Sequence, residues 1–132
     1  MLQQDYILRI IREFAEALSL LRREKKDVRQ KEEALLKLYD AYVGDNIFYH
    51  TATIDDIMDS FRRFPEEERL DRMEMLAELY YAESDLKTGI AREQLLTNAR
   101  QLFIFIDQHS RTLSLARQQR IIAIEKSLNT PK

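Results

Sequence analysis

The chain contains very few residues that interrupt regular structure, with two glycines and two prolines among 132 residues. Folds built from many short strands need frequent turns, and such turns are rich in glycine and proline. Gly44, Pro65 and Gly89 lie where they can separate helices, and Pro131 lies next to the end of the chain. The sequence therefore predicts an all-α fold with long helices.

Length and composition favour a single helical domain covering residues 1–132. The hydrophobic share is 45%, which is more than intrinsically disordered segments carry. The chain has no cysteine, so the sequence excludes thiolate catalysis, disulfides and zinc–thiolate sites. The formal net charge of −2 does not point to nucleic acid or an anionic membrane as a ligand. Charges interrupt the apolar N-terminal stretch, so we expect neither a signal peptide nor a spanning helix, and we expect a cytoplasmic protein.

The first part of the chain, residues 1–44, is predicted to form a helical hairpin. Its first helix should run from about residue 5 into the early twenties, because apolar residues recur there at alternating spacings of four and three. These residues are Ile7, Ile11, Phe14, Leu18 and Leu21. Gly44 fits the backbone position that closes the second helix.

The charged segment between these two helices leaves two alternatives open. Either one helix continues through residues 22–33, or the chain turns near Lys26 and Asp27, with Asp27 as the N-cap of a second helix. We favour the turn, because a continuous helix would leave its middle without a core.

Residues 45–64 are predicted to form a loop followed by a short helix. The apolar residues 47–49 should pack under the neighbouring hairpins, because they are too hydrophobic for a free loop. Thr53 and the acidic residues after it resemble a capping box, which predicts the start of the short helix. Pro65 predicts its end, since the residue before a proline avoids helical angles.

Residues 65–128 are predicted to form a long hairpin and a C-terminal helix, which brings the total to about six helices. Pro65 and the glutamates after it favour a helix start, and Gly89 favours the end of that helix. The second helix of the hairpin is expected to bury Leu95, Leu96, Ala99, Leu102, Phe103 and Ile106. The C-terminal helix, after a break at residues 109–112, is expected to carry the apolar residues Leu113, Leu115, Ala116, Ile121, Ile122, Ile124 and Leu128.

The long hairpin resembles the helical hairpins of tetratricopeptide repeats. The residues that match the pattern are Met73, Leu76, Ala77 and Tyr80 on the first helix, and Ala99 and Phe103 on the second. The interval between Tyr80 and Ala99 is longer than in the standard repeat, which implies extended helices. The resemblance implies a tetratricopeptide-like array or bundle of hairpins.

The chain also resembles an uncharacterised bacterial family of all-helical, tetratricopeptide-like proteins. The resemblance rests on the DYILR-type start at residues 5–9 and on the acidic segment at residues 53–61. It covers most of the chain. No activity is assigned to that family, so the resemblance implies no catalytic residues.

An excess of acidic residues marks the first helix of the long hairpin. Residues 66–85 contain eight acidic and two basic residues. Five positions recur at spacings of three and four, which places them on one side of the helix. We call these five residues the acidic stripe: Asp71, Glu74, Glu78, Tyr81 and Asp85.

In a tetratricopeptide hairpin this face lines the groove, so the resemblance implies that the acidic stripe binds a protein partner, in particular a basic one. Two alternatives remain open. The stripe could be an ordinary solvated face, or it could pair within the fold with Arg117 and Arg120 of the C-terminal helix.

No residue pattern points to catalysis, a metal or a cofactor. His50 and His109 lie far apart in the sequence and show no metal-ligand spacing, and no phosphate-binding glycine loop or nucleophile elbow is present. An enzyme with an unrecognised carboxylate site is one alternative. A nucleic-acid-binding or regulatory protein that uses the basic segment at residues 22–31 is another, but acidic residues are interleaved there, as is typical of a solvated surface.

We therefore expect a non-catalytic protein–protein interaction or scaffold domain with no cofactor and no membrane contact. Its first helix should either cap the array or form a homodimer contact, because the ends of a helical array need to be covered.

Overall fold

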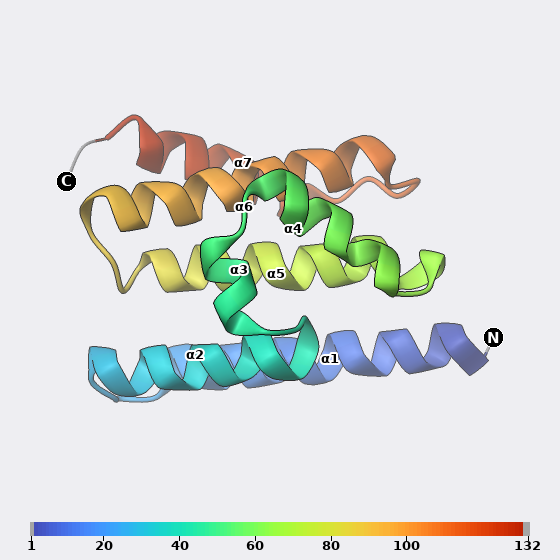
Figure 1. Ribbon diagram of the computed structural model, residues 1–132, viewed down its shortest axis with the longest axis horizontal. Coiled ribbons are helices and arrows are strands. Elements are labelled where there is room, and N and C mark those ends of the chain that lie inside the picture. Colours follow the sequence, from blue (N-terminus) through green and yellow to red (C-terminus); the bar gives the residue numbers. More distant parts are fainter. Residues whose placement is uncertain (1, 131–132) are drawn as a thin grey trace. The chain divides into compact units, whose positions relative to one another are not determined.

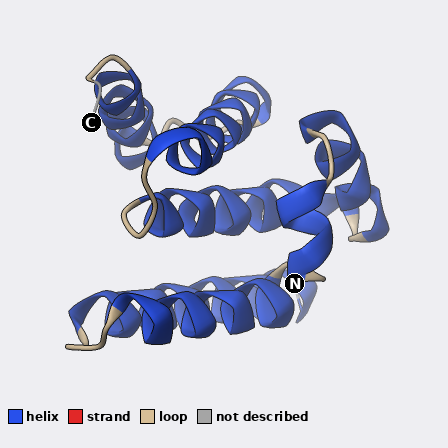
Figure 2. Cartoon of the chain, turned by 60° about the vertical axis from the view of Figure 1, so that its left-hand side comes forward, coloured by secondary structure: helices blue, strands red, loops and turns tan. Residues whose placement is uncertain are grey.

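The computed structural model describes residues 2–130, and every regular element in that range is a helix (Figures 1 and 2). The predicted all-α fold is confirmed. Seven α-helices and two short 3-10 helices follow one another along the described chain. The chain divides into two compact units, Met1–Met75 and Leu76–Lys132, with the boundary inside helix α5. None of the described helices is both long and apolar enough to span a bilayer.

The first unit begins with a hairpin of α1 (Leu2–Arg23) and α2 (Val28–Tyr42), which pack side by side in opposite directions (Figure 1). The chain turns between them, as favoured from the sequence. Asp27 is the N-cap of α2: its carboxylate accepts a hydrogen bond from the Gln30 N–H at 2.8 Å, and the Gln30 side chain accepts one from the Asp27 N–H at 3.2 Å. This reciprocal pair is a capping box. The buried residues of the hairpin are Ile7, Phe14, Leu18, Leu21, Leu35, Tyr39 and Val43.

Gly44 follows α2 with a φ of +157°, in the range that favours glycine. Its N–H donates to the Tyr39 carbonyl at 2.8 Å, which closes the helix. A side chain at this position would have no room, because a Cβ atom would collide with the Arg63 guanidinium and lie 3.2 Å from the Tyr49 ring. The Arg63 guanidinium is held there by donating to the Val43 carbonyl.

The segment predicted as a loop contains helix α3 (Asn46–Thr51). Asp45 starts this helix by accepting a hydrogen bond from the Ile47 N–H at 3.0 Å. Tyr49 is buried as predicted, but Ile47 is 67% exposed, so the prediction that it packs inward is wrong. The reason is helical geometry. Ile47 and Tyr49 are two residues apart, so their side chains are separated by roughly 200° around the helix axis and lie on opposite sides of α3.

Helix α4 (Ile54–Ser60) starts where the sequence predicts. The Thr53 side chain accepts a hydrogen bond from the Asp56 N–H at 3.2 Å. A 3-10 turn, η1 (Phe61–Arg63), follows and ends before Pro65. Ile57 and Phe61 are fully buried in this part of the unit.

A second 3-10 turn, η2 (Glu66–Glu68), precedes α5 (Arg69–Ser84). The helix therefore starts one turn later than predicted. It also ends earlier, because Gly89 is the first residue of α6 (Gly89–His109) and does not close α5. Gly89 has a φ of +61°, a left-handed conformation that favours glycine, and the connection between the two helices lies before it.

In the second unit, α6 and α7 (Leu115–Leu128) pack against each other in opposite directions (Figures 1 and 2). All six residues predicted to be buried on α6 are buried. Of the seven apolar residues expected on the C-terminal helix, Leu113 lies before α7 and Ile124 is the buried one. Leu113, Leu115 and Ile122 are exposed by 72%, 68% and 54%.

Candidate functional site

Four residues of the acidic stripe lie on α5, and Asp85 lies in the turn that follows the helix. The boundary between the two units falls within the stripe. Asp71 and Glu74 belong to the first unit, and Glu78, Tyr81 and Asp85 to the second. The first four are half-buried, and Asp85 is exposed.

Arg120 of α7 contacts two members of the acidic stripe in the second unit. Its Nη2 donates to Glu78 Oε1 at 2.9 Å, and its Nε donates to Glu78 Oε2 at 3.3 Å. Its guanidinium carbon lies 4.4 Å from the centre of the Tyr81 ring. The two-pronged ion pair and the cation–π contact fix the orientation of all three side chains.

The pKa of Arg120 reflects this environment. Burial lowers the pKa, but the hydrogen bonds and the charge of Glu78 more than offset that effect, so the pKa is raised above its ordinary value. The guanidinium is thus held charged against Glu78. This is the pairing considered from the sequence for Arg120. Arg117 pairs with Asp107 at 3.0 Å.

Three ion pairs fix the sides of α7 that face the rest of the second unit. Besides the Glu78 and Asp107 pairs, Arg100 Nη2 lies 2.8 Å from Glu125 Oε2. Arg117 is buried although it is charged. Arginine therefore occupies positions on α7 that a hydrophobic pattern assigns to apolar residues.

The opposite side of α7 is solvent-exposed. Leu115, Gln119, Ile122 and Lys126 follow one another at spacings of four, three and four residues, which aligns them along the helix. All four are exposed, and we call them the α7 face. Sequence reasoning did not identify this face, because it listed Leu115 and Ile122 among the apolar residues of the helix without assigning them to a side of it. Arg117 and Arg120, three residues apart on α7, were the available signal for which side faces inward. Each of them pairs with a carboxylate on another helix, Asp107 or Glu78.

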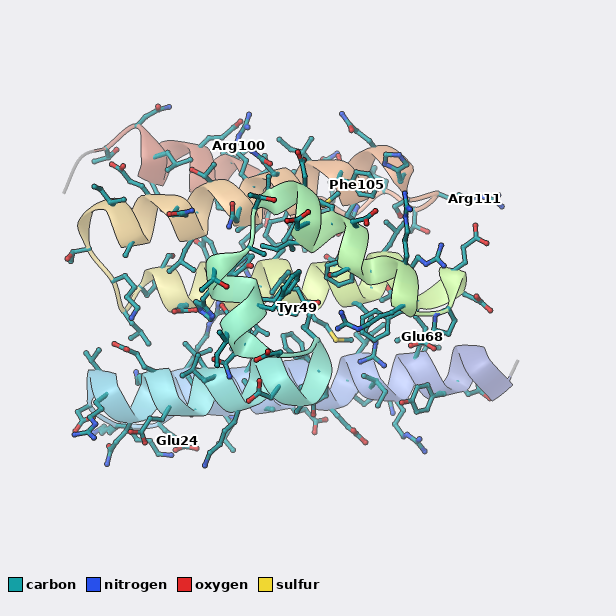
Figure 3. All side chains as sticks on the ribbon, viewed as in Figure 1. Glu24, Tyr49, Glu68, Arg100, Phe105 and Arg111 are labelled. Carbon is teal, nitrogen blue, oxygen red and sulfur yellow. The ribbon has the colours of Figure 1, made fainter. Side chains whose placement is uncertain are left out.

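Arg111 lies on the loop that joins α6 to α7, just before the α7 face, and extends away from both helices (Figure 3). It is exposed, as are Leu113, two residues after it, and Lys126 near the other end of α7. The α7 face thus consists of two aliphatic side chains, one amide and the cation Lys126 near its C-terminal end, and the cation Arg111 lies just before its N-terminal end.

A second group of arginines lies in the first unit, and these arginines donate hydrogen bonds to main-chain carbonyl oxygens of the same unit. Arg72 Nη1 donates to the Tyr42 carbonyl at 2.8 Å, and Arg69 Nε donates to the Phe64 carbonyl at 3.0 Å. With Arg63 on the Val43 carbonyl, these arginines satisfy main-chain oxygens left open where helices end.

Arg72 also pairs with Glu68 (Figure 3), whose carboxylate oxygen lies 3.2 Å from Nη2. Both side chains are buried, at 8% and 5% exposure. The Arg72 donors bond to Glu68 and to the Tyr42 carbonyl, so we interpret this buried ion pair as stabilising the first unit rather than as a binding site.

The remaining candidates from the sequence show ordinary contacts. His50 and His109 each bond through Nδ1 to a carbonyl four residues earlier, at 2.7 and 2.9 Å. In the basic segment at residues 22–31, Lys26 pairs with Glu24 at 2.7 Å and Arg29 with Glu33 at 3.4 Å. Among the residues described, no cluster of histidine, aspartate and glutamate could hold a metal ion.

Comparison of the chain with protein-family models, with curated proteins and with solved structures gave no match. Its function is therefore inferred from the arrangement of its own side chains.

Proposed function

We propose that this chain is a non-catalytic protein–protein interaction domain that binds its partner through the α7 face. The observation that carries the proposal is the alignment of Leu115 and Ile122, both more than half exposed, on one side of a helix. Single exposed apolar residues are ordinary in folded proteins. Aliphatic residues seven apart on one helical face are the pattern by which helices pack on other helices.

Capture of partners from the native host by the immobilised chain tests this proposal. The double substitution Leu115→Gln and Ile122→Gln removes the aliphatic side chains and keeps good helix formers at exposed positions, so the melting temperature should stay close to that of the wild type. Ile90→Gln is the matched control, because Ile90 is 81% exposed on α6 of the same unit.

Quantitative mass spectrometry should show proteins that the wild type and Ile90→Gln retain and the double variant loses. An identical set of retained proteins for all three would refute the proposal.

We propose the acidic stripe as a second contact, for a basic partner segment. Asp85, its exposed member, supports this, whereas Arg120 already engages Glu78 and Tyr81. Asp85→Lys should weaken the binding of an arginine-rich peptide more than Glu93→Lys does, a matched charge change at an exposed position of α6. Equal effects of the two substitutions would exclude the stripe. Glu78→Lys is unsuitable, because it would place a second cation beside Arg120.

We also propose that α1 takes part in self-association. Leu8 and Leu20 are exposed by 51% and 52% on this helix. If α1 forms a dimer contact, light scattering should show a dimer that Leu8→Glu with Leu20→Glu converts to a monomer. A monomeric wild type at high concentration would remove this proposal.

A further inference from the structure

We propose that the occupant of the α7 face is an acidic amphipathic helix of a different protein. This inference rests on the proposed function and specifies the chemistry of the partner. The charges at the two ends of the face, the geometry of the aliphatic residues and the pairing that a second copy would require all favour this occupant.

Positive charge lies at both ends of the face. The arginines on the other sides of α7, Arg117 and Arg120, have carboxylate partners within the second unit. Arg111 and Lys126 are exposed, and neither forms an ion pair with any residue that the structure describes. The α7 face therefore presents uncompensated positive charge at both ends and none between them. Carboxylates on a docked segment would match this pattern.

The geometry of the aliphatic residues selects a helix as the docked segment. Leu115 and Ile122 lie seven residues apart, roughly 10 Å along the helix axis. A partner helix with apolar residues at the same interval can contact both. Ala116 and Ala123 flank the face on one side, and their small side chains allow another helix to approach closely. Gln119, between the two aliphatic residues, can donate to or accept from a polar group of the partner.

A second copy of the chain does not suit the same face. In a two-fold contact with antiparallel α7 helices, Leu115 of one copy meets Ile122 of the other, and Arg111 then lies opposite Lys126. With parallel helices, each Lys126 lies beside its counterpart. Either arrangement brings like charges together, which disfavours the contact.

Fluorescence anisotropy with two designed helical peptides tests the inference on the full chain. Both peptides carry leucines on one face; the first has glutamate on the flanking positions and the second has lysine. The glutamate peptide should bind more tightly by a factor on the order of ten, from two exposed charge contacts that change from attraction to repulsion. The difference should shrink as salt is added.

Two variants locate the effect. Arg111→Glu with Lys126→Glu should reverse the preference between the peptides, whereas Arg12→Glu with Lys37→Glu, the same charge change at exposed sites of the first unit, should leave it unchanged. Leu115→Gln with Ile122→Gln should abolish binding of both peptides.

Several results would overturn the inference. These are equal affinity for the two peptides, no binding of either, a preference that Arg111→Glu with Lys126→Glu leaves unchanged, or a wild-type dimer that Leu115→Gln with Ile122→Gln dissociates. The charge results leave the proposed function standing, because the capture experiment depends on the aliphatic residues alone. Retention of the same host proteins by the aliphatic double variant would instead refute the proposed function itself.

Discussion

Replacement of Arg72 by methionine should lower the free energy of unfolding of the first unit by about 3–5 kcal/mol, the range for breaking a buried ion pair. Arg72 and Glu68 are 8% and 5% exposed. Without the guanidinium, the buried Glu68 carboxylate loses the cation that lies 3.2 Å from it. The Tyr42 carbonyl also loses its donor at 2.8 Å, and an unsatisfied polar group adds about 1–3 kcal/mol where water cannot reach it.

Removal of both charges separates these two contributions. In the double variant Arg72→Met with Glu68→Leu, no buried charge remains unpaired, and buried ion pairs can often be replaced by apolar residues without loss of stability. The remaining loss of stability, about 1–3 kcal/mol, comes from the Tyr42 carbonyl, which has lost its donor. The double variant should therefore be more stable than Arg72→Met alone, and the coupling from the double-mutant cycle should be well above the error of measurement.

Urea unfolding followed by far-UV circular dichroism measures these differences. Amide hydrogen exchange in the first unit should accompany it, because the two compact units need not unfold together. Arg62→Met is the control, since the Arg62 side chain is 80% exposed and its pair with Asp59 at 3.2 Å should contribute about 1 kcal/mol at most. The reasoning is refuted if Arg72→Met unfolds like the wild type, or if the double variant is the less stable of the two.

Three further predictions concern the core, a cap and a titrating group. Phe103→Ala should cost about 3–5 kcal/mol, because Phe103 is completely buried; an unchanged urea midpoint would contradict this. Asp27→Ala should cost about 1 kcal/mol by removing the capping box of α2, while Asp27→Asn retains an acceptor and most of the stability; equal melting temperatures of the two variants would speak against the cap. Hydrogen bonds from the Asn46 side chain and N–H lower the pKa of Asp40 below its ordinary value of 3.8. Its stabilising contribution is therefore complete above that value and is lost as the pH falls through the lower pKa of the folded state, so Asp40→Asn should be less stable than the wild type at pH 7 and should lose that deficit in acid. A deficit that persists at low pH, in unfolding curves measured across this range, would be the contrary result.

The parts of the fold that the sequence predicted correctly depend on local chemistry. Asp27 and Thr53 start their helices because each side chain accepts a hydrogen bond from an N–H three residues ahead, a relation fully contained in the neighbouring sequence. The prediction that Gly89 ends the first helix of the hairpin is wrong, since a glycine between two helices can also begin the second. Its dihedral angle depends on the path of the connection before it.

The burial of α7 could not be predicted in the same way. Which side of an amphipathic helix faces the interior is decided by the partners on other helices. Arg117 and Arg120 look like solvent-exposed residues in the sequence, but Asp107 and Glu78 draw them inward. Leu115 and Ile122 are left outside in consequence. Four residues of the acidic stripe lie on α5 and Asp85 lies just after it. The contact of Arg120 with two members of the stripe could be found only in the tertiary structure.

The room beside Gly44 has an evolutionary consequence. Glycine at this position and arginine at position 63 permit each other, because any side chain at 44 would occupy the space of the guanidinium that bonds to Val43. Replacement of Gly44 alone displaces the guanidinium and removes the donor of a carbonyl at the end of α2. Replacement of Arg63 alone removes the same donor and leaves residue 44 with a φ of +157°, which still favours glycine. Homologues should therefore retain the glycine even where the arginine is lost.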